Sequence, residues 1–159
     1  FPYTTRFRSP SLTWRIIGGS PDSATAAAPG VSYEGLLHSD VPAERSRMSS
    51  ILSNAFLLVH PTREDVNPLV IAEAAYYGCP AISVREFAIP ELIDDGRTGL
   101  LVSPPPDSGE VARAVEKLLL DRTRYRAMRR EAREYSLTKF SWERTGAVIC
   151  DSIASVIGS

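Results

Sequence analysis

Residues 56–83 constrain the fold of this chain most, because two short apolar runs are separated by a single helix-forming stretch. The first run, residues 56–60 (FLLVH), is apolar without alternation. That pattern is typical of a parallel strand buried on both faces. The second run, residues 81–84 (AISV), is predicted to be the next strand. A strand, a helix and a strand in this order predict a parallel pair joined by a crossover helix.

The helix between these strands has clear start and stop signals and is predicted over residues 67–77. Asn67 is a favoured N-cap, and Pro68 suits a first helical position because it lacks the N–H that would be unpaired there. Gly78 and Pro80 then end the helix. The helix N-terminus therefore comes after the carboxyl end of the first strand, where backbone N–H groups and the helix dipole favour an anion.

The alternation of strands and helices continues through the rest of the chain. Further strands are predicted over residues 12–18, 31–37 and 98–102, a helical turn over 90–94, and helices over 42–54, from Asp107, over 123–137 and from Ser141. Asp107 and Glu110 predict a capping box. In the last helix we expect the apolar side chains to face the core, namely Trp142, Ile149, Ile153 and Val156. The fold class is α/β, a Rossmann-like three-layer domain with a mainly parallel sheet and helices on both faces.

Composition excludes several classes of function. The chain has 159 residues, 43% hydrophobic and 23% charged, as in an ordinary globular domain. A net charge of −1 gives no field that would favour nucleic acid, and no apolar run approaches the roughly 20 residues of a transmembrane segment. Two separated cysteines indicate a reducing compartment. The two histidines lack a second ligand at metal spacing, so no metal site is predicted.

Domain organisation is predicted to be simple. Residues 1–10 differ in character from the rest of the chain and are interpreted as a non-native or disordered segment, and residues 11–159 as one domain closed by C-terminal helices. Residues 20–30 are small, polar and bounded by Pro and Gly, which predicts a loop or a weak short helix. The first residue is Phe rather than Met, so we expect a fragment of a longer protein.

Two acidic residues mark the central stretch as a candidate site. Glu73 lies in LVIAEAA without a cation at helical spacing, and an unpaired carboxylate facing a core is costly. Glu73 therefore either turns to the surface or faces a polar cleft that holds a ligand. Asp65 lies in the loop before the helix, where it either contributes to a ligand site or only supports the helix dipole.

Together with its flanks, this stretch resembles the nucleotide-sugar half of glycosyltransferase family 4, a retaining family with the two-domain GT-B fold. The central match is an acid, seven residues and Glu, here Asp65 to Glu73 within HPTREDVNPLVIAEAAYYGCPAIS. The similarity extends to LTWRIIGGSPD, GVSYEGLL, IPELIDDGRTGLLVSPP and KFSWERT. It implies that the chain is the C-terminal half of a GT-B fold, with residues 11–159 as the donor-binding domain.

The resemblance also implies roles for individual residues. Glu73 would accept hydrogen bonds from the donor ribose, and Asp65 would lie near the transferred sugar. The backbone around Val66, Asn67, Pro68 and Leu69 would hold the diphosphate, and Gly35, Leu36 and Leu37 would line the base pocket. No cofactor and no metal are implied, and a UDP- or GDP-sugar is the expected donor.

The same resemblance implies partners and a location. The acceptor, a carbohydrate or a lipid-linked molecule, would bind through a missing N-terminal domain, so the full-length protein would transfer a hexosyl group and this chain alone would be inactive. We expect the protein to lie in the cytoplasm, with peripheral attachment to the inner face of the membrane as a further expectation. The base, the donor sugar, the acceptor and the oligomeric state are not specified by the sequence.

Three departures from the family pattern keep alternatives open. Asp65 stands where Glu is usual, Asn67 and Pro68 stand where Phe-Gly is usual, and Phe87 and Ala88 replace Gly-Gly. The bulk of the last pair would narrow or block the donor-sugar site. One alternative is therefore a GT-B-like binding module that has lost catalysis.

The other alternative is a different enzyme on the same fold, such as a sugar-nucleotide epimerase or a phosphorylase. A phosphorylase of this kind needs a lysine that binds pyridoxal phosphate. Lys117 and Lys139 are the only lysines, and both lie on charged helices, which disfavours the phosphorylase.

Overall fold

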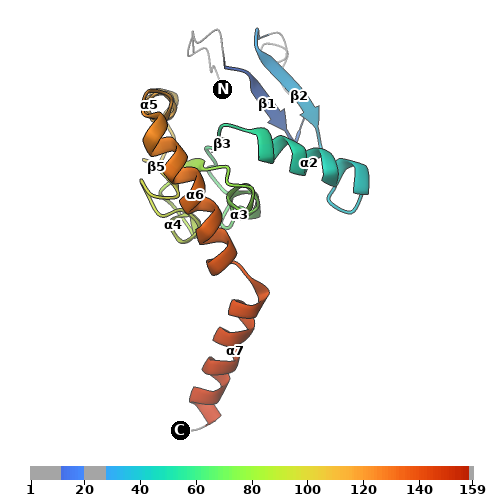
Figure 1. Cartoon of the computed structure of the whole chain (residues 1–159), viewed down its shortest axis with the longest axis vertical. Coiled ribbons are helices and arrows are strands. Elements are labelled where there is room, and N and C mark those ends of the chain that lie inside the picture. Colours follow the sequence, from blue (N-terminus) through green and yellow to red (C-terminus); the bar gives the residue numbers. More distant parts are fainter. Residues whose placement is uncertain (1–11, 20–27, 158–159) are drawn as a thin grey trace. The chain divides into compact units, whose positions relative to one another are not determined.

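A computed structural model describes residues 12–19 and 28–157 of the chain. The predictions for residues 1–10, and for residues 20–27 of the predicted loop, lie outside the described residues. The chain divides into two compact units, Phe1–Ile51 and Leu52–Ser159. Figure 1 gives the element labels. The assignment of residues 11–159 to one domain stays a prediction.

The first unit contains the first two predicted strands, which pair as a two-stranded parallel sheet in the described part of the chain. β1 (Trp14–Ile17) pairs with β2 (Val31–Gly35) in parallel. β2 ends two residues earlier than predicted because Gly35 has a φ of 76°, a left-handed conformation that interrupts an extended strand. Helix α2 (Pro42–Asn54) begins in this unit. Arg47 on α2 donates a hydrogen bond from Nε to the Glu34 carboxylate over 2.8 Å, which ties α2 to β2.

The second unit contains the predicted parallel sheet around the central stretch. β3 (Leu58–His60), β4 (Ala81–Val84) and β5 (Gly99–Val102) pair in parallel in the order β3-β4-β5. Every residue of the middle strand β4 is buried, as is typical of a central parallel strand, and its one polar residue, Ser83, donates a hydrogen bond to the His60 carbonyl. The helices of this unit are α3 (Leu69–Tyr76), α4 (Ile89–Leu92), α5 (Ser108–Leu120), α6 (Arg122–Lys139) and α7 (Trp142–Ile157). The fold class is therefore confirmed.

The core of this unit lies between the sheet, α3 and α6. Small residues on α3, Ala74 and Ala75, are buried and permit close packing. On α6, Ser136 donates to the Ala72 carbonyl over 3.2 Å, and Tyr125 donates to the Phe56 carbonyl over 2.7 Å. These bonds join α6 to α3 and to the residues that lead into β3. α6 therefore holds one side of α3 firmly in place.

The predicted capping box of α5 is half correct. The Asp107 carboxylate accepts a hydrogen bond from the Glu110 N–H over 2.8 Å, so Asp107 is the N-cap. The Glu110 carboxylate does not return to Asp107. Instead it accepts a hydrogen bond from the Ser103 N–H over 3.1 Å, which fastens the end of β5 to the start of α5.

The prediction that the apolar face of α7 points into the core is wrong. α7 has no buried residue, and Trp142 is 88% exposed. Its cap is as predicted, since Ser141 Oγ accepts a hydrogen bond from the Arg144 N–H over 3.2 Å. Figure 1 shows α7 running on from the end of α6. Local sequence therefore sets the helix and its amphipathic pattern, but no described element covers that face.

Candidate functional site

The site lies where β3 and β4 end. The two strands are parallel, so their carboxyl ends meet at one edge of the sheet, the edge at which ligands bind in α/β folds. The loop after β3 contains Asp65 and Val66, and the loop after β4 contains Phe87 and Ala88. The Ala88 N–H donates to the Val66 carbonyl over 3.1 Å, so the two loops are joined.

The loop after β3 has internal hydrogen bonds that orient Asp65. Thr62 Oγ1 accepts hydrogen bonds from the N–H groups of Asp65 (2.9 Å) and Glu64 (3.3 Å). The Asp65 Oδ2 atom lies 3.7 Å from His60 Nε2, and the Asp65 side chain is 44% exposed. Asp65 therefore lies at the mouth of the site, beside the last residue of β3.

His60 also lies at this edge of the sheet. From the sequence it is considered only as a possible metal ligand, and no role at this site is predicted for it. Its Nδ1 atom is buried and has no hydrogen-bond partner among the described residues. Its carbonyl accepts a hydrogen bond from Ser83 Oγ over 2.7 Å, which locks the end of β3 to β4. The signal for His60 in the sequence was its position, because it is the last residue of a strand that leads into an acidic loop.

The start of α3 differs from the prediction by one residue. Pro68 is the N-cap, with extended backbone angles, and the helix begins at Leu69, so the predicted cap at Asn67 is wrong. The residue before a proline avoids the helical region, which keeps Asn67 outside the helix. No side chain caps this end. Pro68 is buried while Val66 and Leu69 are exposed, so this turn presents backbone and apolar side chains to solvent.

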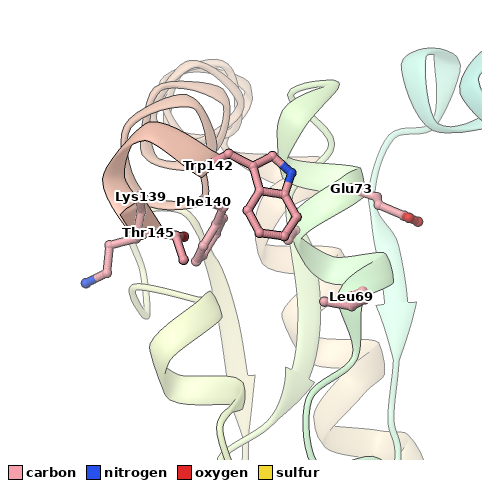
Figure 2. A pocket seen from close by; sticks show the side chains of 7 residues that line it. Leu69, Glu73, Lys139, Phe140, Trp142 and Thr145 are labelled. Atoms are coloured by element: carbon pink, nitrogen blue, oxygen red, sulfur yellow. The ribbon is translucent and has the colours of Figure 1, made fainter. Parts of the chain in front are cut away.

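Glu73 is exposed and also lines a cavity. The cavity has a volume of about 360 Å³, and its lining residues are Leu69, Ala72, Glu73, Lys139, Phe140, Trp142 and Thr145. Figure 2 shows the side chains of Glu73 and Lys139 pointing in opposite directions. Within the described residues the Glu73 carboxylate has no hydrogen bond and no ion pair. Its oxygens are therefore available to a ligand with donor groups.

The predicted base-pocket residues lie in the first unit. Gly35 ends β2, Leu36 is exposed and Leu37 is partly buried. Because Gly35, Leu36 and Leu37 belong to one unit and Glu73 to the other, their assignment to a single site stays a prediction.

The described part of the chain has neither a reactive thiol nor a metal-binding cluster at this edge. Burial raises the pKa of the Cys79 thiol to about 11, with Arg129 opposing the shift in part, so this thiol is neutral and unreactive. Among the described residues, no group of three or more His, Cys, Asp or Glu side chains could hold a metal ion.

The fold and this edge define a Rossmann-like domain of the GT-B glycosyltransferase type. The family described as "Glycosyl transferases group 1" matches residues 6–135, and the chain belongs to that family.

Two curated relatives are mycobacterial enzymes. The chain is 30% identical over 158 residues to a GDP-mannose-dependent alpha-(1-6)-phosphatidylinositol monomannoside mannosyltransferase of Mycolicibacterium smegmatis, covering 94% of this chain and 41% of that protein. It is 29% identical over 141 residues to the D-inositol 3-phosphate glycosyltransferase of Mycobacterium tuberculosis, covering 87% of this chain and 29% of that protein. The chain thus spans less than half the length of these relatives.

Solved structures agree on the fold. Sucrose-phosphate synthase from Thermosynechococcus elongatus superposes with a TM-score of 0.66 at 25% identity, over 81% of this chain and 31% of that one. Anabaena HepE in complex with UDP-glucose superposes with a TM-score of 0.74 at 18% identity, over 92% of this chain and 42% of that one.

Proposed function

We propose that this chain is the donor-binding half of a retaining glycosyltransferase, which moves a hexosyl group from a nucleoside-diphosphate sugar to an acceptor. The observation that carries the proposal is Glu73. It is a carboxylate on an otherwise apolar helix, exposed beside a cavity and without a partner in the described chain. A carboxylate in that position suits the two vicinal hydroxyls of a ribose, which donate charge-assisted hydrogen bonds.

The neighbouring groups support the rest of the donor. The N-terminus of α3 presents backbone N–H groups and the positive end of the helix dipole, which favour a diphosphate. We assign this role to the backbone around Val66, Asn67, Pro68 and Leu69. Asp65, one residue earlier, would meet the hydroxyls of the transferred sugar. Gly35, Leu36 and Leu37 would line the base pocket.

In the proposed reaction the bond between the anomeric carbon and the diphosphate oxygen breaks, and a bond to the acceptor oxygen forms. The proton of the acceptor hydroxyl passes to solvent, and the nucleoside diphosphate leaves with the bonding electron pair and the negative charge. Donors at the start of α3 would stabilise that charge, an electrostatic contribution of about 3 kcal/mol by comparison with oxyanion holes. We propose that neither a metal ion nor another cofactor takes part.

The relatives support particular donor and acceptor classes. The M. smegmatis relative is named for GDP-mannose and a phosphatidylinositol monomannoside, and the HepE structure contains UDP-glucose. We therefore propose a GDP- or UDP-hexose as donor and a carbohydrate or lipid-linked acceptor that binds a further domain of the whole protein. A cytoplasmic location with peripheral attachment to the inner face of the membrane accompanies this proposal. The described residues contain no helix long and apolar enough to cross a membrane.

Calorimetric titration of the 159-residue chain with GDP-mannose and UDP-glucose tests the proposal. We expect one of these donors to bind, and Glu73→Gln to weaken that binding about 10- to 100-fold, because hydrogen bonds to a charged group are lost. Glu116→Gln is the matched control, since Glu116 is an exposed glutamate on α5 away from the cavity. Absence of binding to either donor, or equal binding by the Glu73 variant, would contradict the proposal.

A further inference from the structure

Phe87 has a backbone conformation that its side chain disfavours. Its φ is 55°, and it is the sole non-glycine residue with a positive φ in the described part of the chain. Bulky residues rarely occupy this left-handed region, whereas glycine enters it without a steric penalty. Residues in such strained conformations concentrate at ligand-binding sites, where the side chain has a use that offsets the strain.

The ring of Phe87 is only about half buried. The residue is 51% exposed, although its neighbour Ile89 is completely buried. No ring or cation contact of Phe87 is found among the described residues. The turn is held instead by the backbone and by Ile89, so an interior packing role does not explain why an aromatic ring stands at this position.

The position of Phe87 places it at the ligand edge of the sheet. The next residue, Ala88, donates its N–H to the Val66 carbonyl over 3.1 Å, and Val66 comes directly after Asp65. Val66 and Phe87 are both exposed and the Asp65 side chain is 44% exposed, so the two joined loops offer two apolar side chains and one carboxylate to solvent. A surface that combines an aromatic ring with a carboxylate suits a sugar, which has an apolar C–H face and hydroxyl groups around its rim.

We propose that Phe87 is a specificity-determining residue of the donor site, and that its ring packs against the C–H face of the transferred hexose. This inference rests on the proposed function. It assigns to the ring a contact with the sugar and not with the nucleotide. The ring therefore contributes to the affinity for a nucleoside-diphosphate hexose and leaves the affinity for the nucleoside diphosphate alone unchanged.

The test compares each complete donor with its nucleotide. The chain is titrated with UDP, UDP-glucose, GDP and GDP-mannose, and the variants are Phe87→Ala, Phe87→Gly and Phe87→Trp. We expect Phe87→Ala and Phe87→Gly to raise the dissociation constant of the nucleoside-diphosphate hexose roughly tenfold. The dissociation constant of the corresponding nucleoside diphosphate should change less than about twofold. Phe87→Trp keeps a ring and should stay within about threefold of the parent. Leu120→Ala, at a highly exposed apolar residue of α5, is the control.

Thermal unfolding gives a second readout that separates the ring from the fold. Glycine accepts the left-handed φ, so Phe87→Gly should unfold at the parent temperature or about 2–4 °C above it, even though it binds the hexose less well. A fall in the unfolding temperature for both Phe87→Gly and Phe87→Ala would show that the ring serves packing and would overturn the inference.

The binding outcomes separate the two proposals. If the parent binds no donor, the proposed function fails and the inference fails with it. If the parent binds a donor and the Phe87 variants bind it equally well, the inference alone is overturned. An equal loss for the nucleotide and its hexose conjugate would place the ring against the base and would also overturn it.

Discussion

The two ends of α3 are built differently, although they belong to one helix of eight residues. At the C-terminal end Gly78, Cys79 and Pro80 are all buried, and Arg133 of α6 donates to the Tyr76 carbonyl over 3.1 Å. At the N-terminal end Leu69 is 66% exposed, and no side chain caps the helix. Burial and contacts with α6 therefore close one end, whereas the first residue of the helix is exposed at the other.

This difference predicts that stability and the proposed binding depend on different parts of a single element. The carbonyl groups at the closed end have partners, since the Tyr77 and Gly78 N–H groups bond to Ala74 and Ala75. The acid of the loop and the Phe87 turn follow the strands at one edge of the sheet near the open end, and the unpaired Glu73 carboxylate is exposed farther along the same helix. Substitutions on the packed face and at the closed end should therefore change the free energy of unfolding, and substitutions at the open end should change ligand affinity.

The largest expected effect on stability is on the packed face of α3. Ile71 is 1% exposed, and Ile71→Ala should lower the free energy of unfolding by about 3 kcal/mol through lost burial and a cavity. Urea denaturation measures this change. Leu69→Ala, two residues earlier on the exposed side, should cost less than about 0.5 kcal/mol. Similar losses in both variants would show that α3 does not have one packed face and one exposed face.

A smaller effect is expected at the closed end itself. Gly78 has a φ of 67°, and a Cβ atom there would lie 3.3 Å from the Arg129 carbonyl oxygen. Gly78→Ala should therefore cost about 1–2 kcal/mol. The matched control is Gly146→Ala in α7, where an added Cβ meets nothing within 4 Å and helix propensity should raise stability by up to about 1 kcal/mol. A neutral result at Gly78 would mean that this end is not tightly packed.

The smallest expected effect on stability is a fall in the free energy of unfolding at alkaline pH, which comes from Cys79. Burial raises the pKa of its thiol to about 11, so the unfolded chain loses this proton at lower pH than the folded chain does. The contribution of the neutral Cys79 thiol to stability is thus fully present below the ordinary thiol pKa, and it falls as pH rises toward 11. The expected loss is about 1 kcal/mol by pH 10, and Cys79→Ala should remove it.

Thiol labelling at pH 8 provides the control for Cys79. Cys150 is exposed and should react at once with a disulfide reagent, whereas Cys79 should react only when the chain unfolds. If both thiols of the folded chain react at the same rate, the conclusion that the C-terminal end of α3 is closed is wrong.

The order of the strands and of α3 could be predicted from sequence because each rests on a local pattern. The apolar run of β4 and the stop at Gly78 are signals that neighbouring residues carry by themselves. The start of α3 lies one residue later than the capping pattern predicts, because the effect of Pro68 on Asn67 competes with the capping preference of Asn67. Local chemistry therefore fixes which elements form more securely than it fixes their ends.

Features that depend on tertiary packing could not be predicted in this way. The periodicity of α7 indicates an apolar face, but it does not say what covers that face, and the structure leaves Trp142 exposed. Periodicity likewise left Glu73 undecided between surface and cleft, and in the structure it is exposed while lining a cavity. The sequence indicates the left-handed backbone of Phe87 only indirectly, because Phe87 stands where the family pattern has glycine.

Donor binding mapped along α3 by NMR tests most directly whether the open end is the binding end. A ¹⁵N-labelled chain is titrated with GDP-mannose and UDP-glucose, and amide chemical shifts are measured at each step. We predict that the largest changes fall on residues 62–69, Glu73 and residues 86–88, while residues 76–80 change little. Shifts that are largest at residues 76–80, or no shifts with either donor, would contradict this division of α3.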